Sequence, residues 1–204
     1  MQISEEQKTK KRLVVATGNV HKLREIAEIF TDFDVVSQKQ MGFLDEVEEN
    51  GSTFAENALI KARAAAKALG CIALADDSGI CVDALGGAPG VYSARYAGEH
   101  GSDKANRDLL LKNMENVTDR TAYFISAIAL VYPDGKELLA EGRTYGKVLH
   151  EEQGDGGFGY DCIFESDDLK KSFGLATAEE KNAVSHRFRG LQAMRKLWEA
   201  EEEK

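Results

Sequence analysis

The first forty residues carry the pattern of a strand, a helix and a second strand. Residues 12–16 (RLVVA) form a short apolar, β-branched run, which predicts a buried strand. Apolar side chains then recur at helical spacing over residues 20–30, which predicts a helix with one apolar face. Residues 34–37 fit a second short strand. Residues 17–19 form a turn between the first strand and the helix, so a strand–turn–helix unit is expected at the start of the domain.

The strongest helix signal begins at Thr53. Glu56 follows three residues later, which predicts a capping box, and Gly70 is expected to end the helix. The predicted packing stripe of this helix comprises Phe54, Ala58, Ala62, Ala65 and Leu69. A strand over residues 72–75 is expected next, and the polar sequence DDSG at 76–79 is expected to follow the end of that strand.

The second half of the chain predicts a loop, a helix, a hairpin and a final helix. Residues 86–101 fit a glycine-rich loop, and a helix is expected from about Ser102. Residues 122–132 and 136–141 predict two strands joined by a Pro-Asp-Gly turn. A second capping box, formed by Thr177 and Glu180, predicts a helix that reaches about residue 200.

The order of these elements predicts the fold class and the domain organisation. Strands and helices alternate early and a hairpin follows, which predicts an α/β fold with a mixed sheet. We find no internal repeat and no low-complexity linker, so a single domain is expected over residues 12–200. The polar residues 1–11 are expected to form a flexible extension.

Composition narrows the class of protein. The chain has 204 residues, 43% of them hydrophobic and 30% charged, which suits one large domain or two intimate lobes. The net charge of −9 argues against binding to a long nucleic acid, which requires a basic face. Three cysteines without a CxxC pair indicate neither a disulfide framework nor a zinc site. No apolar run suits a membrane span and the polar start is unlike a secretory signal, so a cytoplasmic protein without a membrane partner is expected.

Residues 16–22 (ATGNVHK) form a candidate phosphate-binding loop. They lie where a strand ends and a helix begins, and the free N–H groups and positive end of a helix favour an anion there. Gly18 lets the backbone approach a ligand closely, and Lys22 can reach a phosphate from the first helical turn. The alternative is purely structural, with Asn19 capping the helix and Lys22 in solvent.

Carboxylates gather in two places that suit a divalent cation. Glu46, Glu48 and Glu49 precede the capped helix, and Asp76 and Asp77 follow an apolar run. Mg²⁺ prefers hard oxygen ligands, often one or two carboxylates completed by water and substrate phosphates. The alternatives are a solvated acidic loop for the glutamates and an aspartate-capped turn for the pair.

Two later segments are candidate base-binding elements. Residues 156–161 (GGFGYD) place glycines beside two aromatic rings, and a ring face suits stacking on a nucleobase. On the last predicted helix, Lys181 and Arg187 offer cations to a phosphate or a carbonyl oxygen. Asn182 and His186 are four residues apart and are expected to share a helix face. The alternatives are an ordinary glycine-rich turn and a solvated basic face.

Taken together, these segments resemble the inosine/xanthosine triphosphate pyrophosphatases, which hydrolyse deaminated purine nucleotides. The resemblance runs from Leu13 to Trp198, and the segments that carry it are 16–22, 53–62 (TFAENALIKA), 75–98 (ADDSGICVDALGGAPGVYSARYAG), 156–161 and 180–187 (EKNAVSHR). It implies an elongated, two-lobed α/β fold around a long twisted mixed β-sheet, with the active site in the cleft between the lobes. It also implies a homodimer that uses Mg²⁺ to release pyrophosphate from the purine nucleoside triphosphates ITP, dITP and XTP.

The same resemblance implies roles for the carboxylates and for the loop after the first strand. Asp77 is the expected general base that activates water, and it is expected to share the metal with Glu49, for which Glu48 remains an alternative. Ser78 is expected to contact the substrate. The triphosphate is expected to bind the loop made of Thr17, Gly18, Asn19, Val20, His21 and Lys22.

The base-binding roles implied by the resemblance fall on the two later segments. Phe158 is expected to stack on the base, and Lys181 is expected to contact the nucleotide. His186 and Arg187 are expected to read the 6-oxo group of hypoxanthine or xanthine. The base loop comprises Phe158, Gly159, Tyr160 and Asp161.

Three departures from the family pattern and three other activities stay open. His21, Cys162 and Phe188 each stand where many members have another residue, and the last could alter base selectivity. A related pyrophosphatase for modified pyrimidine nucleotides is one alternative. A haloacid-dehalogenase-type phosphatase is a second, although the adjacent Asp76 and Asp77 do not match its DxD arrangement. A non-catalytic nucleotide sensor is a third.

Overall fold

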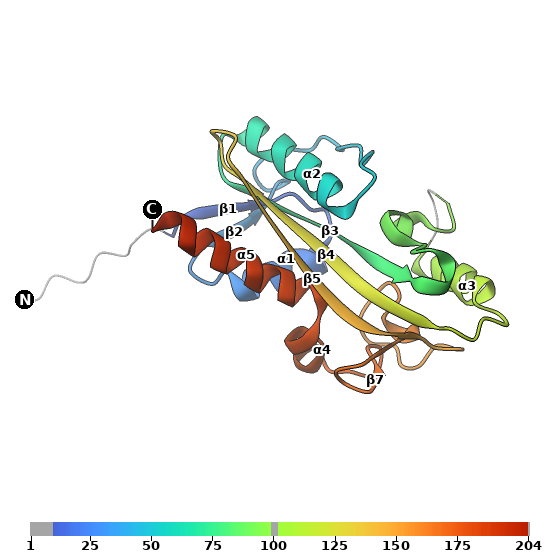
Figure 1. Cartoon of the computed structure of the whole chain (residues 1–204). Helices are drawn as coiled ribbons and strands as arrows, with labels where there is room; N and C mark the ends of the chain where they lie inside the picture. Colours follow the sequence, from blue (N-terminus) through green and yellow to red (C-terminus); the bar gives the residue numbers. More distant parts are fainter. Residues whose placement is uncertain (1–9, 99–101, 204) are drawn as a thin grey trace, which may run out of the picture.

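The computed structural model describes residues 10–98 and 102–203, and it contains one seven-stranded sheet (Figure 1). The strand order is β2-β1-β3-β4-β5-β6-β7, parallel from β2 to β3 and antiparallel from β3 onward. The strands are β1 (Arg12–Val15), β2 (Asp34–Ser37), β3 (Ala73–Val82), β4 (Thr121–Val131), β5 (Glu137–Val148), β6 (Phe164–Ser166) and β7 (Lys171–Ser172). The helices are α1 (Val20–Ile29), α2 (Phe54–Leu69), α3 (Asp103–Asn113), α4 (Ala178–Val184) and α5 (His186–Glu202), with short 3₁₀ turns η1 (Asp83–Leu85), η2 (Gly90–Arg95) and η3 (Asp161–Ile163).

The long strands β3, β4 and β5 run through the whole molecule and connect two lobes. Figure 1 shows α1, α2 and α5 around one end of these strands and α3 and β7 around the other. Burial alternates residue by residue along β5, because successive side chains of a strand point to opposite faces of the sheet. The mixed α/β fold expected from the sequence is confirmed.

Helix α2 covers one face of the sheet, which we call the α2 face, through small side chains. Its alanines pack on alanines of β3 and β4, including Ala75 and Ala127, and this close contact needs no large side chain. Thr53 caps the helix by accepting a hydrogen bond from the Glu56 N–H, and Gly70 ends it with a φ of +61°. The predicted capping box forms only in half, because the Glu56 carboxylate bonds the N–H of Ser52 at 2.7 Å.

Helices α1 and α5 cover the opposite face, which we call the α5 face, with larger apolar side chains. The buried set includes Ile26 of α1 and its C-cap residue Phe30, Leu191, Met194 and Trp198 of α5, and Leu74, Ile128 and Leu130 of the sheet. Helix α5 approaches β5 so closely that a Cβ on Gly142 would lie 2.1 Å from the carbonyl oxygen of His186. The start of α5, which carries two predicted site residues, is therefore held against the sheet.

Three predicted elements differ from the structure. Residues 76–79 do not follow a strand; they lie in the middle of β3, where every residue from Ala73 to Val82 pairs with β4. The predicted last helix is broken at Ser185, whose ψ is 150°, so Asn182 and His186 belong to different helices and do not share a face. The predicted loop at 86–101 includes η2 in its described part.

The remaining elements follow the predictions, with small changes in their bounds. The hairpin forms as expected, although its second strand continues to Val148. The capping box of Thr177 and Glu180 is complete at the start of α4. Of the predicted extension at 1–11, residues 1–9 lie outside the described part of the chain. Within residues 10–98 and 102–203, no helix has the length and apolar character that crossing a membrane requires.

Candidate functional site

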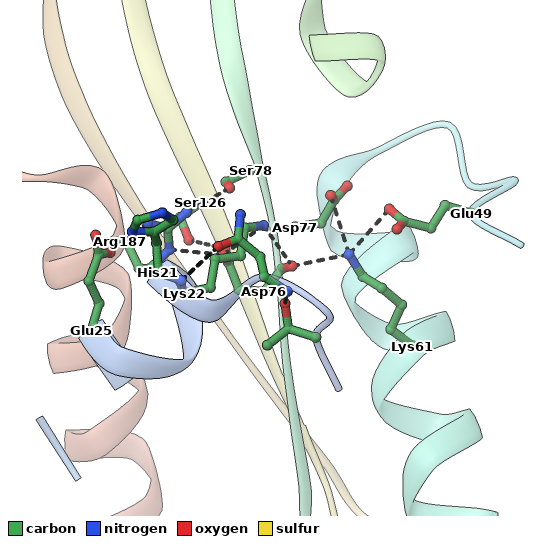
Figure 2. Close-up of polar contacts among 12 residues, drawn as sticks. His21, Lys22, Glu25, Glu49, Lys61, Asp76, Asp77, Ser78, Ser126 and Arg187 are labelled. Carbon is green, nitrogen blue, oxygen red and sulfur yellow. Dashed lines mark hydrogen bonds and ion pairs between the residues drawn. The ribbon is translucent and has the colours of Figure 1, made fainter. Parts of the chain in front are cut away.

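The candidate site lies at an edge of β3, beyond the point where β1 ends. β1 pairs with β3 only at Ala73 and Leu74, so its pairing stops before Asp76. The Asp76 carbonyl oxygen instead accepts hydrogen bonds from the ammonium groups of Lys22, at 3.4 Å, and Lys61, at 3.1 Å. Figure 2 shows polar side chains from β3, α1, α2 and α5 gathered around this edge. The short first strand therefore leaves a polar edge that draws in two cations.

The side chains of Asp76 and Asp77 lie on opposite faces of the sheet. They are consecutive residues of one strand, so their side chains point to opposite faces. Asp76 lies on the α5 face with Leu74, and Asp77 lies on the α2 face with Ala75. In Figure 2 the carboxylate of Asp76 accordingly meets Lys22 and Arg187, while that of Asp77 meets Lys61.

The Asp76 carboxylate is fully buried and fully bonded. It accepts a hydrogen bond of 2.5 Å from the Ser126 hydroxyl, and it forms ion pairs of 3.0 Å with Lys22 and 2.9 Å with Arg187. Burial alone would raise the pKa of this carboxyl, but the two cations outweigh it and hold the pKa far below the usual value. Asp76 therefore carries a permanent negative charge that fixes two cations.

Arg187 connects Asp76 to two other elements. Its Nη1 donates to Glu25 on α1 at 2.5 Å, and its Nη2 donates to the hydroxyl of Ser78 at 3.1 Å. Its side chain is 2% exposed, and the pKa of the guanidinium is raised because the attraction of Asp76 and Glu25 exceeds the effect of burial. A guanidinium has five N–H groups. The bonds to Asp76, Glu25 and Ser78 use three of them, so two can still meet a ligand.

Asp77 and Glu49 are the carboxylates best placed to hold a cation. The Lys61 ammonium lies between them, 3.5 Å from Asp77 Oδ1 and 3.2 Å from Glu49 Oε2. Asp77 Oδ2 is buried without a hydrogen-bond partner. Burial raises the pKa of Asp77 against the attraction of Lys61. Two carboxylates, an unpaired oxygen and a cation already drawn between them fit a divalent metal.

Of the two glutamates that the sequence offered as metal ligands, Glu49 faces the candidate site and Glu48 does not. Glu48 is exposed, whereas Glu49 lines a cavity of about 500 Å³ together with Lys61, Asp76 and Asp77. Within residues 10–98 and 102–203 there is no group of three or more His, Cys, Asp and Glu side chains that could hold a metal. Such a metal would therefore need further ligands from water or from a substrate.

The turn after β1 lines the same cavity. Asn19 caps α1 by accepting hydrogen bonds from the N–H groups of His21 and Lys22, and Thr17 accepts one from Asn19. The alternative interpretation of this turn, in which Asn19 caps the helix and Lys22 lies in solvent, is thus correct for Asn19. It is wrong for Lys22, because the Lys22 side chain is only 15% exposed and pairs with Asp76. Thr17, Gly18, Asn19 and Lys22 line the cavity, whereas Val20 is 71% exposed.

The base loop closes a second, smaller cavity of about 160 Å³. Asp161 holds the loop by accepting a hydrogen bond from the Phe158 N–H at 2.8 Å and pairing with Lys181 at 2.7 Å. Gly157, with a φ of +74°, leaves room for the Asp161 carboxylate, which a Cβ would approach to 2.2 Å. The Phe158 ring stacks on His21 of α1, with 5.5 Å between ring centroids. This contact joins the base loop to the phosphate loop.

His186 forms part of the wall of the second cavity. Its ring stacks on Phe124 of β4, with 4.8 Å between centroids, and its Nδ1 is buried without a partner. Burial lowers the pKa of His186 well below its usual value, so the imidazole is neutral at pH 7. A neutral ring can present either a donor or an acceptor to a ligand.

The structure brings together most of the predicted site residues and adds three. The two adjoining cavities are lined by Thr17, Gly18, Asn19, Lys22, Glu49, Asp77, Ser78, Phe158, Gly159, Tyr160, Asp161, Lys181, His186 and Arg187. Sequence reasoning assigned no role to Lys61, Glu25 or Ser126, although Lys61 lies in the motif at 53–62, and it treated Asp76 only as a candidate metal carboxylate beside Asp77. The place of Lys61 four residues after Asn57 on the buried face of α2 was the available signal.

This geometry defines a class of protein: an α/β protein whose interlobe cleft combines cations for a polyanion, a carboxylate pair for a cation and an aromatic platform. The chain belongs to the Ham1 family, whose model matches residues 13–197.

Individual relatives agree with that assignment. The dITP/XTP pyrophosphatase of Streptomyces coelicolor is 47% identical over 189 residues, which is 90% of this chain and 94% of that protein. The enzyme of the same name from Clostridium perfringens is 45% identical over 195 residues, 91% of this chain and 96% of that protein. The solved structure of the Staphylococcus aureus Ham1 protein superposes with a TM-score of 0.87 at 41% identity, covering 94% of this chain and 100% of that chain.

Replacing the buried Asp76 is expected to destabilise the whole protein. Asp76→Ala leaves Lys22 and Arg187 as buried cations without their shared anion, which costs about 3–5 kcal/mol. Urea unfolding measures this loss. Asp34→Ala is the control, because its ion pair with Arg12 is solvent-exposed and is worth less than about 1 kcal/mol. Equal losses for the two variants would contradict the role given to Asp76.

Burial of neutral His186 is expected to make stability depend on pH. The folded-state pKa is lowered, so below the ordinary value of about 6.5 the unfolded chain binds a proton that the folded protein does not. This contribution is complete above about pH 6.5 and is lost by about 1.4 kcal/mol per pH unit as the pH falls below it. His186→Phe keeps the stack on Phe124 and removes the titration. Unfolding free energies measured from pH 7.5 to 5.5 should diverge from those of the variant; parallel curves would refute the neutral, buried state.

Proposed function

We propose that this protein hydrolyses the non-standard purine nucleoside triphosphates ITP, dITP and XTP to the monophosphate and pyrophosphate. The observation that carries the proposal is the arrangement of Asp77 and Glu49 on either side of the Lys61 ammonium, beside a separate aromatic pocket. Lys22 adds a second cation where it pairs with the neighbouring Asp76. Family membership and relatives named dITP/XTP pyrophosphatases support the same reaction. The reaction removes deaminated purines from the nucleotide pool.

The larger cavity is the proposed site of the triphosphate. Lys22 and Lys61 supply positive charge, and the turn at the positive end of α1 lines the same cavity. Both lysines are paired with carboxylates, so a triphosphate competes with Asp76, Asp77 and Glu49 for them. A divalent cation on Asp77 and Glu49 would offset that negative charge and let Lys61 turn to a phosphate.

Mg²⁺ is the proposed cofactor, held by Asp77 and Glu49. When bound, it would neutralise phosphate charge and lower the pKa of coordinated water. Asp77 is the proposed general base, because its Oδ2 is buried beside the proposed metal without a hydrogen-bond partner and can receive a proton from water. It would take a proton from the water that attacks the α-phosphorus, and pyrophosphate would leave with charge offset by Lys22.

The smaller cavity is the proposed site of the base. Phe158 supplies a ring face, and Lys181 holds the ring's loop through Asp161. The two remaining N–H groups of Arg187 are donors for a 6-oxo group. Adenine presents a 6-amino donor there, so two donors would face each other in a buried site and binding would weaken. This reasoning favours a 6-oxopurine such as hypoxanthine or xanthine over adenine.

Two further expectations from the sequence stay predictions: a homodimer and a cytoplasmic location. Sedimentation of the purified protein measures the first, and fractionation of cells that produce it measures the second.

A product assay tests the proposed function. With Mg²⁺, the protein should release pyrophosphate from ITP and XTP and little from ATP, GTP or dUTP. Asp77→Asn should lower turnover about 10²- to 10⁴-fold, as expected for loss of a general base. Asp83→Asn is the matched control at the end of the same strand, because its exposed carboxylate lies outside both cavities.

Each other outcome points to a different activity. Orthophosphate as the product would indicate a phosphatase, and dUTP as the preferred substrate would indicate a pyrimidine enzyme. Binding of ITP without any product would indicate a nucleotide sensor. Wild-type turnover by the Asp77→Asn variant would leave the reaction standing but remove Asp77 as its base.

A further inference from the structure

The base loop is anchored on its outer side by helix α3, which lies in the lobe away from the carboxylates. The inner anchor, Asp161 with Lys181, belongs to the pocket described above. The outer anchor consists of two side chains one turn apart on α3, Asp103 and Arg107. Both bind the backbone of Gly159, the residue after Phe158.

The two contacts fix both polar groups of one peptide residue. The Gly159 N–H donates to Asp103 Oδ2 at 2.9 Å, and the Gly159 carbonyl oxygen accepts from Arg107 Nη1 at 2.9 Å. Gly159 has a φ of +60°, a backbone conformation that most residues avoid. Without these two contacts, the Phe158 ring would still be held by Asp161 and by its stack on His21, but the glycine beside it would let the loop take more orientations.

Helix α3 is itself tied to the strand that carries the catalytic aspartate. Asn106 on α3 accepts a hydrogen bond from the Ala97 N–H at 2.8 Å and donates to the carbonyl oxygen of Ala94 in η2 at 3.2 Å. In η2, the Ser93 hydroxyl accepts from the Ile80 N–H of β3 at 3.0 Å, and the Ser93 carbonyl accepts from the Tyr160 hydroxyl at 2.7 Å. Helix α3 is therefore fixed to β3 through η2, so the two side chains of the outer anchor hold the base loop against a well-connected part of the fold.

Arg107 is held in place for this role. Its Nε donates to Glu152 at 2.7 Å, and its side chain is only 16% exposed. A guanidinium bound on both sides loses little further entropy when it fixes a neighbouring loop. Asp103 is exposed, which leaves it free to be replaced with little effect on packing.

We propose that Asp103 and Arg107 are positioning residues that set the affinity for the purine base by holding the Phe158 loop ready to stack. The proposal rests on the proposed function of the same site. Both side chains act on the loop backbone. Neither lines the cavity that holds Asp77 and Glu49, although Asp103 also borders the base cavity beside the loop. A loop that must be ordered on binding weakens the substrate complex and the transition state equally, which raises KM and leaves kcat unchanged.

The test compares Asp103→Ala, Arg107→Ala and Asp103→Asn with the wild type on ITP. Each alanine variant should raise KM about 3- to 10-fold, the usual effect of losing one hydrogen bond, with kcat within about twofold. Asp103→Asn keeps an acceptor for the Gly159 N–H and should restore most of the loss. The matched control is Asp108→Ala, which removes another carboxylate from α3, one that pairs with the exposed Lys104.

A base-free ligand separates positioning from a general structural defect. Tripolyphosphate used as a competitive inhibitor occupies the phosphate end alone, so its inhibition constant should not change in the alanine variants. The ratio of kcat/KM for ITP to that for ATP should also stay constant, because the loop stacks on any purine.

Three results would overturn the proposal. They are an unchanged KM for ITP in both alanine variants, an equal rise of the tripolyphosphate inhibition constant, and a loss confined to kcat. Failure of the proposed function is distinct from these results, since it would appear as a wild-type protein that releases no pyrophosphate from ITP.

Discussion

Asp76 carries a buried negative charge at the point where β1 stops pairing with β3, and the rest of the site depends on it. Its carboxylate fixes Lys22 on α1 and Arg187 on α5, and through Arg187 it also reaches Glu25 and Ser78. A buried carboxylate is costly unless cations surround it, and the cations here are equally costly without the carboxylate. Lys22, the proposed phosphate-binding residue, and Arg187, the proposed base-reading residue, are thereby fixed relative to each other by one anion.

The alternation of a strand extends this arrangement to the other face of the sheet. Asp77 follows Asp76 directly, so it points to α2, where Lys61 and Glu49 lie. Its environment has the opposite effect on its pKa: burial raises the pKa of Asp77, whereas cations lower that of Asp76. Two neighbouring aspartates thus have different tasks, one as a fixed structural anion and the other as a group able to accept a proton.

The sequence predicted the features that local signals determine. The turn at 16–22, the cap at Thr53 and the alanine stripe of α2 follow from residues close together in the chain, and the structure has each of them. The course of β3 was predicted wrongly, because two consecutive aspartates are typical of a turn. Inside a strand, the charge of Asp76 is compensated by Lys22 and Arg187, which lie 54 and 111 residues away in the sequence. Lys61 lies 3.5 Å from the carboxylate of Asp77.

Long-range partners likewise explain what sequence reasoning missed. Nothing near Lys61 indicates that its ammonium meets Asp77, and nothing near Asp103 indicates that it holds a loop 56 residues further on. The break at Ser185 was missed, although Ser is a common residue at the start of a helix. Here its side chain caps α5 by accepting a hydrogen bond from the Phe188 N–H. That break is what turns His186 and Arg187 toward the sheet while Lys181 stays beside the base loop.

The most direct measurement is hydrolysis of XTP by the magnesium-loaded protein in ¹⁸O-labelled water, with mass analysis of both products. Attack on the α-phosphorus by water that Asp77 activates places the label in the monophosphate and leaves the pyrophosphate unlabelled. Label in the pyrophosphate, or in released orthophosphate, would contradict this account, because the reacting phosphorus would then not be the one nearest the sugar.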